Sequence, residues 1–233
     1  TCVFADNRGV MVVKHRPEIF PALPKPVEQI ENLYSFSVLG KDRVAGREAW
    51  VVRIQPKDPD RYEHKLWIDA ASYLLLKSHI LDAQGETLEE VLFTSIKLRD
   101  FIPDSLLTPK LVGKGYTWYR NEAAGNQGAD GTSAKWTVNW LPDGFAMRGY
   151  EEQALAPSRP AVDHMFFSDG LATLSVFVEK SAAPAADGVD DQTSLGAVNT
   201  YTWMTDGYQV TVVGEVPAVT VRRVAGSIAG KED

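Results

Sequence analysis

The sequence lacks several features that would indicate a function class directly. Cys2 is its only cysteine, which excludes an internal disulfide and a zinc site made of cysteines alone. No stretch reaches about 18 consecutive apolar residues, the length that predicts a membrane-spanning helix. The 24 basic residues are outnumbered by 31 acidic ones, giving a net charge of −7. Because phosphate-backbone binding needs a basic surface, nucleic acid is not expected as a partner.

Catalytic and metal-binding patterns are also scarce. The sequence has no G-x-S-x-G elbow and no glycine-rich phosphate loop, and its four histidines do not pair at ligand spacing. His164, shortly before the Ser168-Asp169-Gly170 turn, is the best catalytic candidate, and capping of that turn is the more ordinary interpretation. The residues therefore predict no enzyme, no cofactor and no metal centre.

The first hundred residues have the pattern of short antiparallel strands separated by turns. Four prolines in residues 17–26 argue against a helix there, whereas residues 27–33 favour one or two helical turns. Residues 82–85 are a hairpin-turn signal. The predicted strands are 10–13, 33–39, 49–54, 64–68, 74–81 and 91–96.

A change in composition marks a boundary near the middle of the chain. Residues 104–135 hold Pro109 and five glycines, which predicts a linker, although the aromatic residues 116–119 are expected to form a strand or to pack on a domain. Further strands are predicted at 136–140, 146–150, 173–179 and 207–214. Residues 181–196 are predicted to be an exposed loop, and residues 217–228 a helix with Val221, Val224 and Ile228 on one face.

Two segments of the second half carry a resemblance to a known family. Residues 164–179 combine the turn with an alternating strand, and residues 207–217 form a strand that ends before a helix-opening Pro217. Taken in order with residues 61–78, 85–96 and 140–145, they resemble the RseB/MucB periplasmic regulators of the envelope-stress sigma factor.

The resemblance implies an α+β fold of mostly antiparallel β structure. Residues 1–104 would form part of a curved sheet similar to LolA-type lipoprotein carriers, and 105–135 a linker. Residues 136–233 would form a smaller antiparallel sheet domain with a C-terminal helix. Because the carrier-like domain is incomplete at its start, we expect residues 10–13 to be an exposed edge strand that pairs with another chain as a homo-oligomer.

The resemblance also implies a function. Such proteins bind the periplasmic segment of a membrane-spanning anti-sigma factor of the RseA/MucA type and protect it from site-one proteolysis. Lipopolysaccharide or the acyl chains of mislocalised lipoproteins release them. This assigns the chain to the periplasm, to envelope-stress signal transduction and to alginate regulation. The alternative is a lipid or lipoprotein carrier of the LolA class without a signalling role, and a lipid-processing hydrolase dependent on His164 is a third class.

Two sets of candidate site residues follow, each with a plainer alternative. An acyl-chain cavity would be lined by alternating apolar residues that an ordinary core would also use: Trp50, Val52, Leu66, Ile68, Leu74, Leu76, Ile80 and Phe93. Partner binding would use aromatic residues and arginines, the types enriched at interfaces but also scattered over ordinary surfaces: Trp118, Tyr119, Arg148, Tyr150, Arg222 and Arg223.

Overall fold

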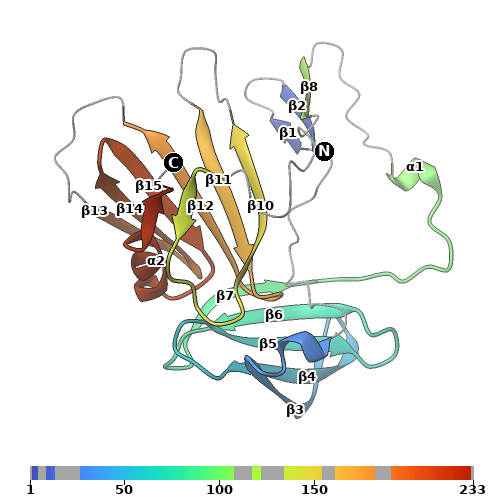
Figure 1. Ribbon diagram of the computed structural model, residues 1–233. Coiled ribbons are helices and arrows are strands. Elements are labelled where there is room, and N and C mark those ends of the chain that lie inside the picture. Colours follow the sequence, from blue (N-terminus) through green and yellow to red (C-terminus); the bar gives the residue numbers. More distant parts are fainter. Residues whose placement is uncertain are drawn as a thin grey trace.

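The computed structural model describes residues 2–4, 9–13, 27–107, 117–121, 134–153, 161–181 and 190–231 (Figure 1). Almost every strand pairing within these residues is antiparallel, and helices are few. The expected α+β class with mostly antiparallel strands is therefore confirmed. No helix in the described part of the chain has the length and apolar character needed to cross a membrane.

The first half forms a five-stranded meander that follows a 3-10 turn, η1 (Val27–Ile30). Its strands lie in sequence order because each pair is joined by a short turn. Gly46 and Gly85 sit in two of these turns with positive φ angles of 78° and 84°, which glycine adopts without strain. The strands are β3 (Tyr34–Val44), β4 (Arg47–Pro56), β5 (Glu63–Asp69), β6 (Leu75–Leu81) and β7 (Thr87–Leu92). The last strand ends at residue 92, four residues before its predicted end. Phe93 still donates its backbone N–H to the oxygen of Leu76, and Ile96 packs against the cluster that holds Leu76, before the chain continues to the short α1 (Asp104–Leu107) (Figure 1).

The second half forms a six-stranded antiparallel sheet, whose strands run upright in Figure 1 while those of the first sheet lie across it. In spatial order its strands are β10 (Ala146–Gln153), β11 (Val162–Ser168), β12 (Thr173–Lys180), β15 (Tyr208–Gly214), β14 (Val198–Thr205) and β13 (Asp190–Leu195). One face is covered by α2 (Ala218–Ala225) and by the small pair β9 (Trp136–Val138) and β16 (Ile228–Gly230).

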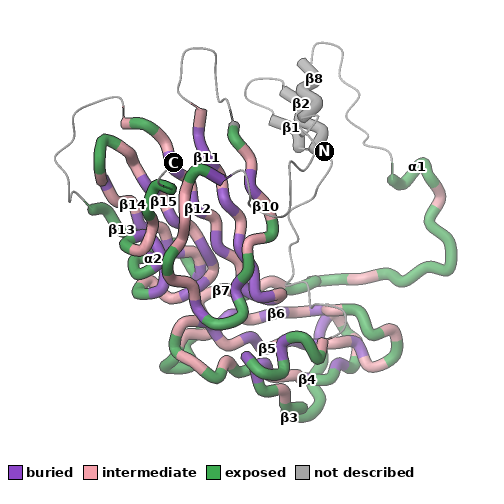
Figure 2. Tube along the Cα trace, in the orientation of Figure 1, coloured by how far each residue is buried: buried purple, intermediate pink, exposed green. Residues whose placement is uncertain are grey.

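Alternation along the central strands explains this second core (Figure 2). In β12, Leu174, Val176 and Val178 are at most 1% exposed, while the residues between them lie on the other face. They pack with Val221 and Val224 of α2. Burying such a side chain contributes roughly 1.5–3 kcal/mol, so the alternating pattern decides which face becomes the core.

Two sequence predictions are wrong in this half. The helix predicted to reach Ile228 ends at Ala225, because residues 228–230 pair with β9. Residues 190–195, predicted as loop, form β13, whose six exposed residues give no apolar alternation. The remaining residues of that predicted loop, 182–189, lie outside the described part.

The strand predicted at residues 10–13 exists, but it is not an edge. It is β2 (Gly9–Val13), which lies between β1 (Cys2–Phe4) and β8 (Thr117–Asn121) and pairs with β8 in parallel. β8 matches the strand expected from the aromatic residues 116–119. Because β2 has neighbours on both sides, the argument for homo-oligomerisation from a free edge at this strand is lost. The proline-rich residues 17–26 lie outside the described part.

Gly214, the last residue of β15, should tolerate no side chain. A Cβ there would lie 2.7 Å from the backbone oxygen of Thr173 and 2.6 Å from Leu174 Cδ2. Gly214→Ala is therefore expected to lower the free energy of unfolding by about 1–3 kcal/mol, measured by urea denaturation. The matched control is Gly149→Ala in β10, where nothing lies within 4 Å of the added Cβ. Equal stability of the two variants would contradict the packing described.

Candidate functional site

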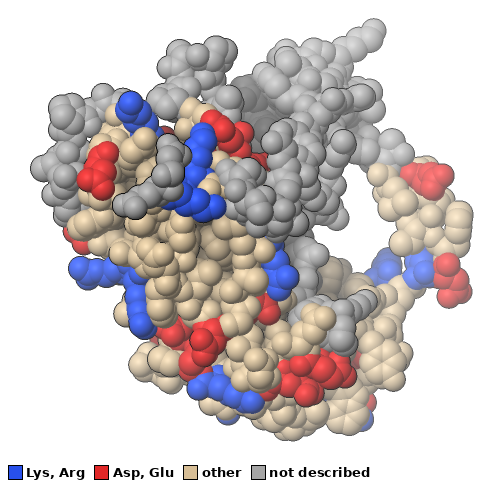
Figure 3. Space-filling model, in the orientation of Figure 1, with Lys and Arg blue, Asp and Glu red and all other residues tan. Residues whose placement is uncertain are grey.

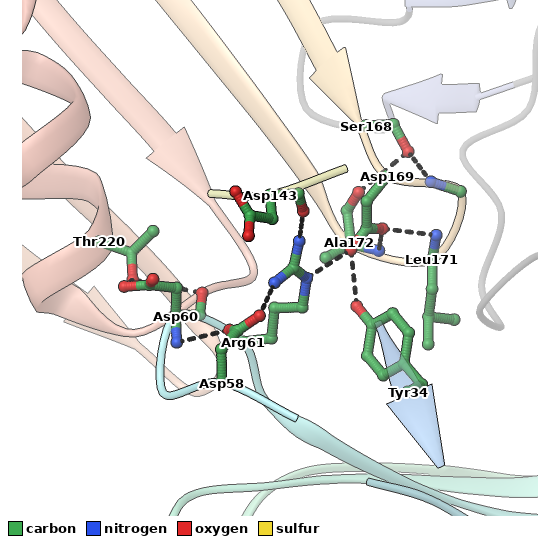
Figure 4. Close-up of polar contacts among 11 residues, drawn as sticks. Tyr34, Asp58, Asp60, Arg61, Asp143, Ser168, Asp169, Leu171, Ala172 and Thr220 are labelled. Carbon is green, nitrogen blue, oxygen red and sulfur yellow. Dashed lines mark hydrogen bonds and ion pairs between the residues drawn. The ribbon is translucent and has the colours of Figure 1, made fainter. Parts of the chain in front are cut away.

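The two sheets are joined by a buried ion pair between Arg61 and Asp169 (Figure 4). Arg61 Nε donates to Asp169 Oδ2 over 2.7 Å, and both side chains are 0% exposed. The same guanidinium donates to the carboxylate of Asp58 and to the backbone oxygen of Asp143. Burial alone would lower the pKa of Arg61, but the hydrogen bond to Asp169 and the neighbouring negative charges raise it, so the guanidinium stays charged.

Asp169 is positioned by its own turn and by Tyr34. Its Oδ1 accepts the backbone N–H groups of Leu171 and Ala172, each over 2.8 Å, while its Oδ2 also accepts the hydroxyl of Tyr34 over 2.8 Å. Burial, together with the Asp169 carboxylate, raises the pKa of Tyr34, which therefore remains a donor. The Ser168-Asp169-Gly170 turn predicted from the sequence is thus confirmed, and it inserts Leu171 into a cluster with Leu33, Ile54 and Leu66 of the first domain.

Two further contacts from the second domain meet the same β4–β5 loop, residues 57–62. Asn199 donates to the Tyr62 hydroxyl over 2.9 Å and to the backbone oxygen of Val216 over 2.8 Å. Thr220, in α2, donates to the backbone oxygen of Asp60 over 3.2 Å. We call this set of contacts, from loop 57–62 to the turn 168–172, Asn199 and Thr220, the junction. It fixes one relative position of the two sheets.

A polar cleft of about 580 Å³ opens beside the junction. Two of its charged residues, Arg53 and Glu63, form a two-pronged pair with distances of 2.7 and 2.6 Å. Its charges therefore largely compensate one another, and it selects neither an anion nor a cation. The lining residues are Arg53, Gln55, Pro56, Asp58, Pro59, Arg61, Tyr62, Glu63, Asp82, Ala83, Gln84, Gly85 and Pro217.

The residues proposed to line an acyl-chain cavity are divided between environments. Trp50 pairs with Ile68 and Val52 with Leu66, so these four share one face of the first sheet. Leu76 is 0% exposed and packs with Val51 and Trp67 in another cluster. A register shift between Trp67 and Ile68 places Leu75, instead of Leu76, opposite Ile68. Of the others, Ile80 packs with Tyr62 and Ala197 at the junction, and Leu74 and Phe93 are exposed.

The residues proposed for partner binding are also divided. Arg148 is exposed in β10, but Tyr150 is 8% exposed and donates its hydroxyl to Asp163 beneath the sheet. On α2, Arg222 lies over the Tyr201 ring and 3.7 Å from Asp190, and Arg223 lies over the Trp140 ring at 3.8 Å. The side chains of Trp118 and Tyr119 lie outside the described part of the chain.

His164 lies in the middle of β11, so it does not cap the nearby turn. Its Nδ1 is 3.2 Å from Glu151 Oε1, its Nε2 is 3.1 Å from Ser175 Oγ, and its ring stacks on Phe177. This order matches a nucleophile, a base and an orienting acid. Acyl transfer also needs donors for the developing oxyanion. Ser175 lies within β12, which pairs with β11 on one side and β15 on the other. The backbone N–H groups around it are therefore used in the sheet and do not serve as such donors.

Acidic and basic side chains are interspersed over the face of the molecule in Figure 3. Sequence reasoning missed Tyr34, Arg61, Asn199 and Asp169 as a group. Arg61 and Asp169 are 108 positions apart, and no local pattern links them.

Comparison with known proteins gives consistent matches over both halves. The model of the MucB/RseB N-terminal domain matches residues 1–111, and that of the MucB/RseB C-terminal domain matches residues 130–229. Sigma-E factor regulatory protein RseB of Haemophilus influenzae is 33% identical over 221 residues, covering 90% of this chain and 65% of the relative. Sigma factor AlgU regulatory protein MucB of Pseudomonas aeruginosa is 32% identical, covering 91% and 65%. The chain thus spans about two thirds of the length of these curated relatives.

Solved structures agree. The complex of Pseudomonas aeruginosa MucA/MucB superposes with a TM-score of 0.72 at 31% identity, covering 88% of this chain and 68% of the other. A crystal structure of MucB in complex with MucA(peri) gives a TM-score of 0.73 at 30% identity, covering 88% and 71%.

Removing Asp169 should destabilise the junction strongly. Asp169→Ala leaves the Arg61 guanidinium buried without its main partner, which is expected to lower the free energy of unfolding by about 3–5 kcal/mol. Urea denaturation followed by tryptophan fluorescence measures this. The matched control is Glu48→Ala, which breaks an ion pair with Lys41 whose side chains are 53% and 45% exposed. A loss no larger than that of the control would show that the Arg61–Asp169 pair contributes little.

Proposed function

Because the chain belongs to the MucB/RseB family, we propose that it binds the periplasmic segment of a membrane-spanning anti-sigma factor of the RseA/MucA type and protects it from site-one proteolysis. The supporting observation is the match of both domains, in order, to relatives solved as complexes with MucA. This assignment places the chain in the periplasm. It requires no catalytic group, because occluding a cleavage site is a matter of binding alone.

The surface we propose for the partner surrounds α2. We call it the arginine surface and define it by Arg222 and Arg223, with Trp140 and the buried Tyr201 beneath them. Each guanidinium lies over an aromatic ring, with its central carbon 5.7 Å from the Tyr201 ring centre for Arg222 and 3.8 Å from the Trp140 ring centre for Arg223. Arg223 makes no ion pair with any residue that the structure describes. A stacked guanidinium of this kind suits a carboxylate on a peptide, so an acidic residue of the anti-sigma segment is the proposed ligand. Val219, 65% exposed on α2, adds an apolar contact.

The surface we propose for the lipid signal lies on the first domain. Val38 and Trp50 are 63% and 39% exposed, on the face shared with Val52 and Ile68. Exposed apolar patches of this kind often mark ligand sites. Acyl chains of lipopolysaccharide or of a lipoprotein are the proposed ligands. The same face continues into the cluster that holds Leu171, so an acyl chain bound there would lie next to residues of the junction.

For lipid to release the partner, it must favour one state of the protein over the other. Moving a population from 1:99 to 99:1 needs about 5.5 kcal/mol of differential affinity. The alternative function, a lipid or lipoprotein carrier of the LolA class, is favoured by the exposed apolar face alone. Native mass spectrometry separates the two, since stoichiometric lipid supports the carrier, whereas an empty protein that captures the anti-sigma segment supports the regulator.

The arginine surface gives a direct test of partner binding. Arg223→Ala should weaken binding of the periplasmic anti-sigma segment by about 10- to 30-fold, as loss of an interfacial arginine commonly does. Isothermal titration calorimetry measures the affinity. Arg99→Ala is the control, because it removes the same charge from an exposed position on the first domain. Equal affinities of the two variants would place the partner elsewhere on the molecule.

The lipid surface is tested by introducing a charge into it. Val38→Glu should leave binding of the anti-sigma segment intact but abolish its displacement by lipopolysaccharide, since burying a carboxylate among acyl chains is strongly unfavourable. Fluorescence anisotropy of a labelled segment follows the displacement. Leu195→Glu, at an 82% exposed position of the second domain, is the control. Displacement that persists in Val38→Glu would remove this face as the lipid site.

A further inference from the structure

His64 is a buried titratable group that neither proposed surface uses. It lies in β5, its side chain is nearly inaccessible at 3% exposure, and its Nδ1 has no hydrogen-bond partner among the described residues. Its cross-strand neighbours are Ile54 and Ile80, which are 0% and 5% exposed. An unsatisfied polar atom in such a place is uncommon and calls for an explanation.

The second domain covers His64. Ile54 belongs to the cluster that receives Leu171, and Ile80 belongs to the cluster that receives Ala197. His64 lies between these two positions in the same row of the sheet, because it pairs with both isoleucines. Separation of the domains would uncover this end of the sheet and give the imidazole access to water.

The charged groups around His64 already have hydrogen-bond or ion-pair partners of their own. Asp169 faces it from the second domain and Glu63 adjoins it on β5. Asp169 is bound by Arg61 and Tyr34, and Glu63 by Arg53. Arg61 is in turn bound to Asp58. Burial lowers the pKa of His64 to about 4, although Asp169 and Glu63 oppose that shift. The imidazole is therefore neutral in the joined molecule at neutral pH.

We propose that His64 makes the junction sensitive to acid, so that protonation of its imidazole separates the two domains. The joined state excludes the imidazolium, whereas the separated state accepts it in contact with water. The inference concerns the junction alone and does not rest on the proposed function. Its consequence for a regulator would be a change in the spacing between the lipid surface and the arginine surface.

The direction of the effect follows from proton linkage. In the separated state His64 titrates near its ordinary pKa of about 6.5. Above that pH both states hold a neutral imidazole and the junction has its full stability. As the pH falls from about 6.5 to 4, only the separated state gains the proton. The equilibrium shifts toward separation by about 30-fold between pH 8 and 5, and the full shift of about 300-fold is reached only below pH 4.

Protonation of Glu215 has the opposite effect on the junction from protonation of His64. The contribution of Glu215 is therefore removed by mutation. Burial, together with the nearby Glu89, raises the pKa of Glu215. Its protonation in acid therefore favours the joined state. Glu215→Gln fixes it in a form like the protonated one, which leaves the His64 contribution alone.

The test measures the distance between domains as a function of pH. Dyes are attached to Glu48→Cys and Lys180→Cys, in the two domains, with Cys2→Ser in the background, and transfer efficiency is recorded from pH 8 to 5. Circular dichroism is recorded in parallel. We expect transfer to change below about pH 6.5 while the circular dichroism stays constant. The change should persist in Glu215→Gln and vanish in His64→Gln.

His79→Gln is the matched control, because His79 lies on the neighbouring strand β6 and pairs with Glu90 near the surface. It should keep the response of the parent protein. A response that survives in His64→Gln, no response in the parent, or loss of circular dichroism together with transfer would each overturn the proposal. Should His64→Gln fail to fold, the imidazole resonances of His64 in the parent protein decide. Titration below about pH 6.5 that coincides with the change in transfer supports the proposal, whereas titration at 6.5, as for an exposed imidazole, or titration that leaves transfer unchanged refutes it.

Discussion

The arrangement of this molecule depends on one desolvated ion pair. A guanidinium and a carboxylate removed from water are tolerated only when their hydrogen-bonding groups are satisfied. Arg61 meets that demand with Asp58, Asp169 and the backbone oxygen of Asp143, and Asp169 meets it with Tyr34 and the N–H groups of its own turn. These partners come from four separate places in the sequence. Only one relative position of the two sheets satisfies all of them, so the pair contributes specificity of orientation as much as stability.

The fold was predictable where it depends on local alternation and turn chemistry. β12 shows this, because its buried and half-exposed residues alternate without interruption. β13 shows the limit, since a strand with no buried residue gives no such signal. The register shift in β6 shows another, because it moves Leu76 away from the face shared by Trp50 and Ile68. A single extra residue in a strand cannot be read from alternation when the neighbouring positions are all leucine.

The candidate site was much less predictable than the fold. The sequence marked the turn around Asp169 and the segment around Arg61, but nothing local joins them. Tyr150 has the composition of an interface residue, yet its ring completes the second core because its hydroxyl finds Asp163 there. Arg222 and Arg223 were identifiable as a pair, whereas their rings, Tyr201 and Trp140, come from distant strands and loops. Contacts between residues far apart in the sequence are set by tertiary packing, and no local pattern in a single sequence predicts them.

The parallel pairing of β2 with β8 has a consequence for how the domains meet. The pairing joins β2, which precedes the five-stranded sheet in the sequence, to β8, which follows it. The next described strand along the chain is β9, which begins at residue 136. Because the two domains belong to one chain, their covalent connection holds the second near the first at an effective concentration of roughly a millimolar. Rejoining after separation is then a first-order event, independent of how much protein is present. An interface too small to hold two free proteins together suffices here, and each molecule returns to the joined state on its own.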